Sequence, residues 1–166
     1  MPNLPRILLA TCLAFGAFHA SDAAAQCAEG TTTYDYWYSA NTQHATGSAF
    51  GLDWRVRPNI DQPGRMVYGP YVTGFGVGSH RAGFVLQVND NVTSPRAIIA
   101  SLKIQSRDGR RILAQRDISR RDFTVVNDWQ WFHLYFENPC GEELETVIDW
   151  RGNAQLIFAQ VHIWRL

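Results

Sequence analysis

Arg-Met-Val-Tyr-Gly-Pro-Tyr-Val, residues 65–72, is followed after a glycine-rich loop by Ala-Gly-Phe-Val-Leu-Gln-Val, residues 82–88. Both segments have the β-branched and aromatic composition that is typical of strands. In the first segment, Gly69 frees the backbone, Pro70 fixes φ and lacks an amide donor, and the flanking tyrosines offer large surfaces with polar tips. This combination predicts a strand that ends at the rim of a sheet.

The rest of the chain repeats this period-two pattern of apolar residues, and no window has a 3.6-residue period over the length of a helix. Segments rich in Gly, Pro, Asn and Asp separate the strands, and they are too short for helical crossovers. The expected strands cover residues 31–39, 49–56, 65–72, 82–88, 97–105, 111–117, 122–126, 131–137, 145–150 and 155–164. The pattern predicts an all-β fold, an antiparallel two-sheet β-sandwich or jelly roll.

Strand alternation also predicts which side chains face the core. In residues 97–105, Ile98, Ala100, Leu102 and Ile104 are expected on one side, and Ser101, Lys103 and Gln105 on the other. In residues 131–137, the expected core residues are Phe132, Leu134 and Phe136, and the expected outward residues are Trp131, His133 and Tyr135.

Residues 1–25 have the pattern of a secretory signal peptide. Arg6 precedes a short apolar run, and an Ala-x-Ala sequence closes the segment, so we expect cleavage before Gln26. The alternative is a lipoprotein signal ending at Cys12, with a very short hydrophobic region. Residues 26–166 have the size of a single domain, and no later segment has the roughly 20 apolar residues of a membrane span. A secreted or periplasmic protein is expected.

The charge of the chain is balanced, with 15 basic and 15 acidic residues. Loss of Arg6 and Asp22 with the signal peptide leaves one fewer of each, and the net charge stays at zero. A nucleic-acid or anionic membrane surface needs clustered positive charge. Because Asp108, Asp117 and Asp122 interleave with the arginines of residues 107–121, we expect a solvated, locally paired surface there. The sequence therefore predicts no nucleic-acid partner.

Two cysteines, Cys27 and Cys140, remain after signal cleavage. An even number of cysteines in an oxidising compartment predicts one disulfide. It would close a loop of about 112 residues and contribute up to about 4 to 5 kcal/mol in the chain-entropy model. The alternative is a metal site that uses both thiolates, which no Cys-x-x-Cys or nearby histidine pair supports. The histidines also lack metal-ligand spacing, so no metal site is predicted.

The order and spacing of the segments resemble bacterial carbohydrate-binding-module-like domains with the galactose-binding-like jelly-roll fold. The resemblance covers roughly residues 53–166 and rests on the Tyr-Gly-Pro-Tyr and Phe-Val-Leu-Gln-Val motifs and on four later segments, which begin at Ala97, Arg111, Trp131 and Ala154. The sequence departs from the family in the loop over residues 74–79, where such domains more often have a Pro-Gly pair and a Tyr. The block Tyr-Asp-Tyr-Trp-Tyr at residues 34–38 has no counterpart in the family.

This resemblance implies a non-catalytic, lectin-like module without a cofactor. It also allows a structural Ca²⁺ held by loop carboxylates and carbonyls, although no dense Asp/Asn/Gly loop marks such a site.

Aromatic residues beside planar polar side chains are the candidate glycan-binding residues. Sugar C–H faces stack on Trp and Tyr, while sugar hydroxyls need Arg, Asp, Asn or Gln as partners. The predicted carbohydrate-binding residues are Arg65, Tyr71, Asn127, Asp128, Trp129, Trp131 and His133. For each single Trp the alternative is packing in the core or at its rim, because a β-sandwich normally buries several aromatics. The expected partner is a glycan or a cell-envelope polysaccharide.

A second interpretation is a structural or protein–protein interaction module of the cell envelope, which the neutral charge suits equally well. An enzyme is not predicted. A glycoside hydrolase would need two carboxylates that face each other across a cleft. The acids Glu142, Glu143 and Glu145 are expected in a solvated loop, and Ser79-His80 lacks the context of a nucleophile elbow.

Overall fold

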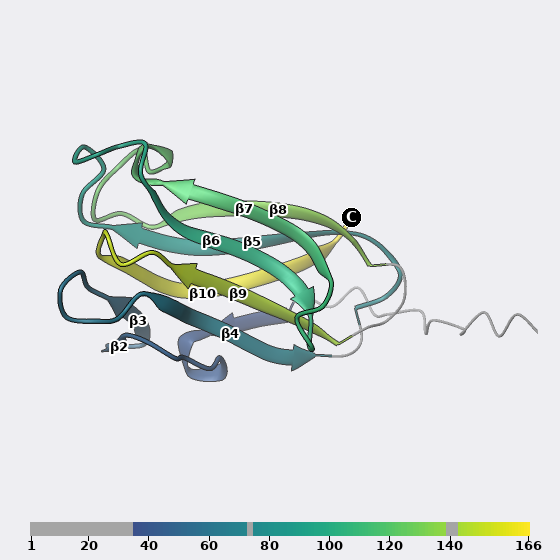
Figure 1. The fold of residues 1–166 in the computed structure, drawn as a ribbon. Coiled ribbons are helices and arrows are strands. Elements are labelled where there is room, and N and C mark those ends of the chain that lie inside the picture. Colours follow the sequence, from purple (N-terminus) through teal and green to yellow (C-terminus); the bar gives the residue numbers. More distant parts are fainter. Residues whose placement is uncertain (1–34, 73–74, 139–142) are drawn as a thin grey trace, which may run out of the picture.

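The computed structural model describes residues 35–72, 75–138 and 143–166. These residues form two antiparallel sheets that pack face to face (Figure 1). Sheet A contains β1 (Asp35–Tyr38), β2 (Ser48–Phe50), β3 (Asp53–Val56), β5 (Gly78–Val88), β8 (Gln130–Asn138) and β10 (Leu156–Arg165). Sheet B contains β4 (Gly64–Val72), β9 (Leu144–Trp150), β6 (Ile98–Ser106) and β7 (Ile112–Ser119). Two 3-10 turns complete the described elements, η1 (Ser39–Asn41) and η2 (Arg120–Asp122).

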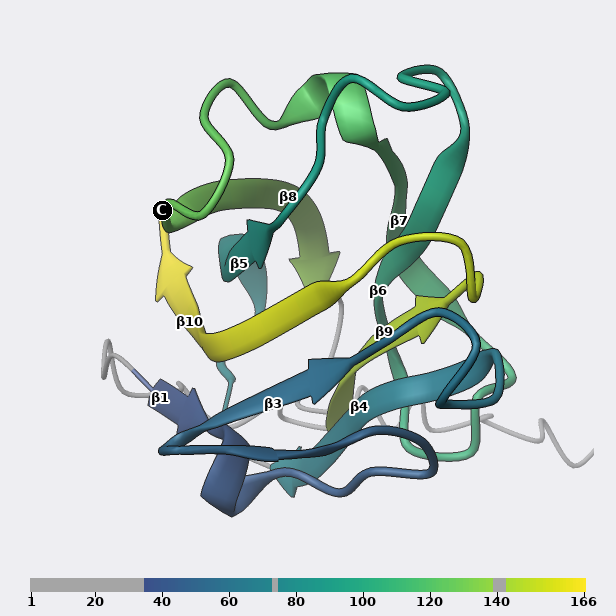
Figure 2. The same ribbon diagram turned by 90° about the vertical axis from the view of Figure 1, so that its left-hand side faces the viewer.

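The strands pair in a nested order, β3 with β10, β4 with β9, β5 with β8 and β6 with β7. The first and third pairs belong to sheet A, and the second and fourth belong to sheet B. Figure 2 places β3, β10, β5 and β8 on one side of the interior and β4, β9, β6 and β7 on the other. This wrapped arrangement is a jelly roll, so the predicted fold class is confirmed.

The core lies between the sheets and follows the predicted alternation, except at Ile98. Ile98, which is expected on the core side, is 38% exposed while Ile99 is buried, because the register of β6 against β7 shifts between Ile98 and Ala100. In β8, Phe132, Leu134 and Phe136 are buried, whereas Trp131 and Tyr135 are 45% and 63% exposed, which confirms the predicted register. The core partners from the other strands include Phe84, Leu86, Phe158, Leu102, Ile104 and Ile148. Each fully buried apolar side chain of this size contributes about 1.5 to 3 kcal/mol.

Two predicted strands are wrong in detail. Residues 49–56 form two short strands, because Gly51 has φ of +66° and turns the chain between β2 and β3. Residues 122–126 contain no strand. Asp122 instead closes the η2 turn, where its carboxylate accepts hydrogen bonds from the backbone N–H and the hydroxyl of Ser119, both at 2.7 Å. Phe123 then enters the core as the buried residue of the following loop.

Three sequence predictions lie outside the described residues. They are the signal peptide over residues 1–25 and the two cysteines of the expected disulfide, Cys27 and Cys140. In the part of the chain that the structure describes, no helix has the length and apolar character of a membrane span.

Candidate ligand-binding face on sheet B

The structure divides the predicted glycan-binding residues between the two outer faces of the sandwich. Arg65 and Tyr71 lie on β4 of sheet B, whereas Trp131 and His133 lie on β8 of sheet A. The two sheets form opposite layers of the sandwich (Figure 2), and the buried side chains of the core lie between them. The predicted residues therefore cannot form one common site.

Strand β9 lies between β4 and β6 and supplies the centre of the outer face of sheet B. Its alternation directs Leu144, Ile148 and Trp150 into the core. Glu145 and Asp149 consequently lie on the outer side, where Glu145 pairs in register with Gln105 of β6. We name the outer side of sheet B around these two carboxylates the Glu145 face.

Glu145 is almost completely buried although it lies on the outer side of its sheet. Its side chain is 2% exposed, and Nε2 of Gln105 donates a hydrogen bond to its Oε2 at 2.8 Å. Nη1 of Arg65 lies 3.8 Å from the other carboxylate oxygen, Oε1. Oε1 has no partner with full hydrogen-bond geometry among the described residues, although the Tyr71 hydroxyl lies near the carboxylate. A buried acceptor in this state costs about 1 to 3 kcal/mol.

The Tyr-Gly-Pro-Tyr motif supplies the aromatic part of the same face. β4 is an edge strand, the Gly69–Pro70 peptide bond is cis, and the register of β4 against β9 shifts between Gly69 and Val72. An isolated bridge joins Gln43 to Tyr68 on the outer edge of β4, and Pro70 follows this bridge, within the register shift, where the sheet tolerates proline. The predicted location of the motif at the rim of a sheet is confirmed.

Arginines cover both tyrosine rings of the motif. Cζ of Arg65 lies 5.8 Å from the ring centroid of Tyr68, and Cζ of Arg107 lies 5.1 Å from that of Tyr71. Both distances are within the range of cation–π attraction. Burial is the largest cause that raises the pKa of Tyr71, followed by the charge of Glu145, the phenol of Tyr68 and a hydrogen-bonding contact with the Glu145 carboxylate, so the Tyr71 hydroxyl lies beside that carboxylate.

Arg65 also connects Glu145 to the second carboxylate of β9. Its Nε lies 3.6 Å from Oδ1 of Asp149, and Nζ of Lys103 lies 2.6 Å from Oδ2 of the same carboxylate. Because these charges are partly buried, solvent screens them less than it screens an exposed pair. The network holds the guanidinium of Arg65 in place beside the tyrosines.

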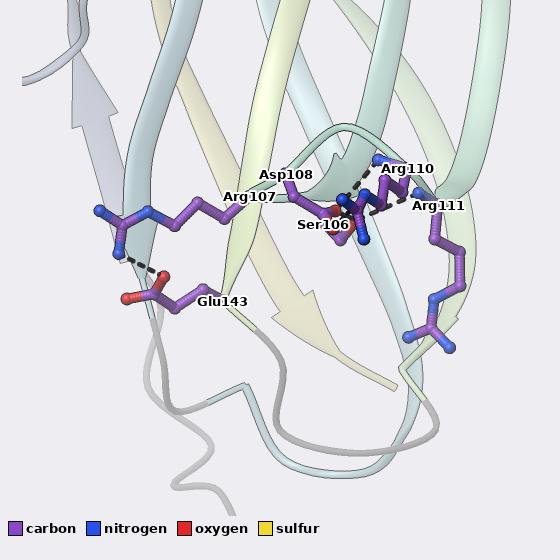
Figure 3. Close-up of a pocket in the computed structure, with 6 residues that line it drawn as sticks. All are labelled: Ser106, Arg107, Asp108, Arg110, Arg111 and Glu143. Atoms are coloured by element: carbon purple, nitrogen blue, oxygen red, sulfur yellow. Dashed lines mark hydrogen bonds and ion pairs between the residues drawn. The ribbon is translucent and has the colours of Figure 1, made fainter.

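The Glu145 face continues into a cavity of about 600 Å³ at the end of the β6–β7 hairpin (Figure 3). The cavity is lined by Ser106, Arg107, Asp108, Arg110, Arg111 and Glu143. Arg107 extends toward Glu143 and contacts its carboxylate at 2.7 Å, whereas Arg111 points away on the other side of the hairpin. The hydrogen bond to Glu143 is the largest cause that raises the pKa of Arg107, and the negative charge of Glu143 is the second.

The predicted loop location of the acids is wrong for Glu145, which lies within β9 and is buried. Glu143 is only half-buried and is paired with Arg107, and Glu142 lies outside the described residues. No group of three or more His, Cys, Asp or Glu side chains that could hold a metal ion occurs in the described ranges.

The second predicted group lies at the start of β8. Trp131 is stacked against His133, with ring centroids 6.0 Å apart, on the outer side of sheet A. Asn127 and Asp128 shape the preceding loop, because Asn127 has φ of +56° and the Asp128 carboxylate accepts a hydrogen bond from the backbone of Trp129. These two polar residues therefore have a local structural role.

Sequence reasoning missed Glu145, Asp149, Tyr68 and Arg107 as parts of one surface. A signal was present, because β6 and β9 each carry polar residues at alternate positions of otherwise apolar strands. The pattern marks these residues as outward-facing. It does not reveal that β4, β9 and β6 are neighbours, which depends on the order of strands in the sheet.

The comparison with known proteins identifies the fold. No protein-family model matches the sequence, and no curated protein matches it either. A similar solved structure is the C-terminal carbohydrate-binding module (CBM6) of LamC, a marine laminarinase from Zobellia galactanivorans. The two share 8% sequence identity and superpose with a TM-score of 0.53, over 80% of this chain and 100% of the module.

Two further similar structures are carbohydrate-binding modules solved with sugars. A module of Cellvibrio mixtus lichenase 5A, in complex with cellotriose, is 14% identical, with a TM-score of 0.46 over 86% of this chain and 94% of that one. A CBM6 module of Clostridium stercorarium, in complex with cellobiose, is 9% identical, with a TM-score of 0.46 over 82% of this chain and 92% of that module. The similarity to the LamC module shows that the described residues share the β-sandwich fold of a carbohydrate-binding module.

Proposed function

We propose that this protein is a non-catalytic glycan-binding module whose ligand occupies the Glu145 face. The observation that carries the proposal is the buried Glu145 carboxylate, whose Oε1 has no partner with full hydrogen-bond geometry among the described residues. A ligand hydroxyl that donates to Oε1 would remove the cost of this unsatisfied acceptor. The face therefore favours a ligand that is rich in hydroxyl groups.

The neighbours of Glu145 match the remaining needs of a sugar. Tyr68 and Tyr71 offer aromatic surface for the apolar C–H side of a pyranose ring. The guanidinium of Arg65 offers planar donors beside them, already oriented by Asp149. The sequence predicts that aromatic rings beside planar polar groups bind the glycan. Arg65 and Tyr71 form such a pair here, whereas Trp131 lies on the other sheet.

The charge of the face supports a neutral glycan. The cations Arg65, Lys103 and Arg107 are matched by the anions Glu143, Glu145 and Asp149. A polyanion would need an excess of unpaired positive charge. We therefore infer that the ligand is a neutral oligosaccharide or polysaccharide.

A binding role agrees better with these carboxylates than a hydrolytic one. Glu143 and Asp149 are held by Arg107 and Lys103 at 2.7 and 2.6 Å, so neither carboxylate is free to face a partner across a cleft. A general acid in a glycosidase needs a raised pKa. Burial raises the pKa of Asp53, which lies on sheet A and not with these carboxylates.

The expected signal peptide supports an exported location, where cell-envelope or extracellular polysaccharides are accessible. The alternative, a protein-interaction module, receives less support. Leu52, Ile60 and Val92, which are strongly exposed apolar side chains, fall in three separate loops. Scattered exposed apolar residues are normal on a soluble surface and do not mark a protein interface.

Titration calorimetry with cellotriose, laminaritriose and xylotriose, preceded by a glycan array, tests the proposal. Glu145→Gln keeps the side-chain shape but removes the charge of the acceptor. We expect it to weaken binding at least about tenfold, as for a charge-assisted hydrogen bond.

Glu137→Gln is the matched control, because Glu137 is exposed on β8 of sheet A, where it accepts a hydrogen bond from Ser79. This variant should bind like the wild type. Equal affinity of Glu145→Gln and the wild type, or no binding to any glycan, would refute the proposal.

A further inference from the structure

Gly83 lies at the centre of the outer side of sheet A, and its lack of a side chain has a specific reason. Its φ is not in the left-handed region, so the backbone alone does not require glycine. A Cβ atom on this residue would lie 2.8 Å from Cε3 of Trp131 and 2.8 Å from Cζ3 of Trp164. The two indole rings occupy the space above Gly83 and lie against the sheet.

Neighbouring side chains hold these indoles in place. The ring centroids of Trp131 and Trp164 are 5.8 Å apart, and His162 lies 5.2 Å from Trp131 and 5.3 Å from Trp164. Cζ of Arg81 lies 4.4 Å from the ring centroid of Trp164. Trp131 is nevertheless 45% exposed, so a fixed ring surface faces solvent. We name this cluster over Gly83 the Trp131 platform.

A cavity of about 350 Å³ adjoins the platform. Its apolar wall consists of Trp129, Trp131, Val85 and Ala159, and Asp53 and Gln160 supply its polar groups. The register of β10 against β5 shifts between Phe158 and Gln160, so that Gln160 faces outward while Phe158 and Val161 remain in the core.

Asp53 is prepared to accept hydrogen bonds from a ligand. Asp53 lines the cavity, and burial, with no charged or hydrogen-bonding partner among the described residues, is the cause that raises the pKa of its carboxyl. With Gln160 it provides planar acceptors and donors beside two tryptophans. The combination suits vicinal hydroxyls next to an apolar ring face.

We propose that the Trp131 platform and its cavity form a second saccharide-binding site, independent of the Glu145 face and on the opposite side of the sandwich. The choice of a saccharide as ligand rests on the proposed function. The volume of the cavity lies in the range of small-ligand sites and accommodates a sugar ring with its substituents. Since the whole core separates the two sites, one domain can hold two glycan chains at once and bridge them.

Calorimetric stoichiometry with the same three trisaccharides tests this inference. We expect two binding events per wild-type domain. Trp131→Ala should weaken one of them at least about tenfold, on the scale of aromatic stacking on another ligand class, and should leave the other within about twofold. Asp53→Asn, which keeps the platform intact, should weaken the same event and covers the case in which Trp131→Ala fails to fold.

The two proposals fail in different ways. One event that Glu145→Gln abolishes, and that neither Trp131→Ala nor Asp53→Asn changes, overturns the second site and leaves the first. One event that Trp131→Ala or Asp53→Asn weakens, and that Glu145→Gln leaves unchanged, overturns the first site and keeps the second. The absence of any binding event overturns both.

Discussion

Nη1 of Arg65 lies 3.8 Å from Oε1 of Glu145, on the outer side of a sheet in which one partner is half-exposed and the other is buried. Arg65 thereby places a positive charge beside a carboxylate oxygen that has no partner with full hydrogen-bond geometry among the described residues. The same ion pair therefore contributes to the stability of sheet B and orients the Glu145 carboxylate that we propose accepts a ligand hydroxyl.

Arg65→Gln should destabilise the fold, because it leaves a buried carboxylate without a cation. We expect a loss of about 1 to 2 kcal/mol, below the value for fully buried pairs since Arg65 is partly solvated. Urea unfolding of Arg65→Gln, Glu145→Gln and the double variant forms the double-mutant cycle. Strictly additive losses would show that the two groups do not interact. Arg110→Gln, at a highly exposed arginine, is the control and should change nothing.

The alternation of inward and outward side chains along single strands could be predicted from the sequence. That alternation identifies most of the residues of the core. The pattern of β8 assigned Phe132 to the core and Trp131 to the surface, as the structure shows. The same pattern could not tell that Trp131 and Arg65 belong to opposite faces. Period two distinguishes inside from outside, whereas membership of a sheet depends on long-range pairing that no local pattern specifies.

Arg120→Lys should destabilise one end of the sandwich. Arg120 is nearly buried and donates to the backbone carbonyls of Thr93 and Asn153, with Asp90 3.5 Å from its Nη1. A lysine has a single ammonium group and lacks the planar guanidinium that donates to the Thr93 and Asn153 carbonyls in two loops at once. We expect a loss of about 1 to 3 kcal/mol in chemical denaturation. Arg121→Lys, at the exposed neighbour, should be silent, and equal losses for both variants would contradict this account.

Gly83→Ala should destabilise sheet A, because the new methyl group meets two indoles at 2.8 Å. Overpacking of this kind costs about 1 to 3 kcal/mol. Thermal unfolding in the wild-type and Trp131→Ala backgrounds measures how much of the cost comes from Trp131. The cost should be smaller in the second background, and an unchanged cost would show that the ring does not lie over Gly83.

The stability of the protein should fall as the pH decreases from 7.5 to 5.5. Burial, as the largest cause, lowers the pKa of His80, His133 and His162 below the ordinary value of 6.5. The unfolded chain then takes up protons near pH 6.5 that the folded chain still excludes, so the free energy of unfolding decreases. Melting temperatures across this range check the sign. A constant melting temperature would contradict it, and a variant with Gln at all three positions should be less sensitive to pH.

The most direct test of glycan binding at the Glu145 face is an NMR titration of the isotope-labelled protein with a saturating oligosaccharide. Gln105 donates its side-chain amide to the carboxylate of Glu145 and reports on that group without being mutated. The account predicts large shifts of this amide and of the backbone amides of Arg65, Tyr71 and Glu145. Binding that leaves β4, β6 and β9 unshifted would contradict it.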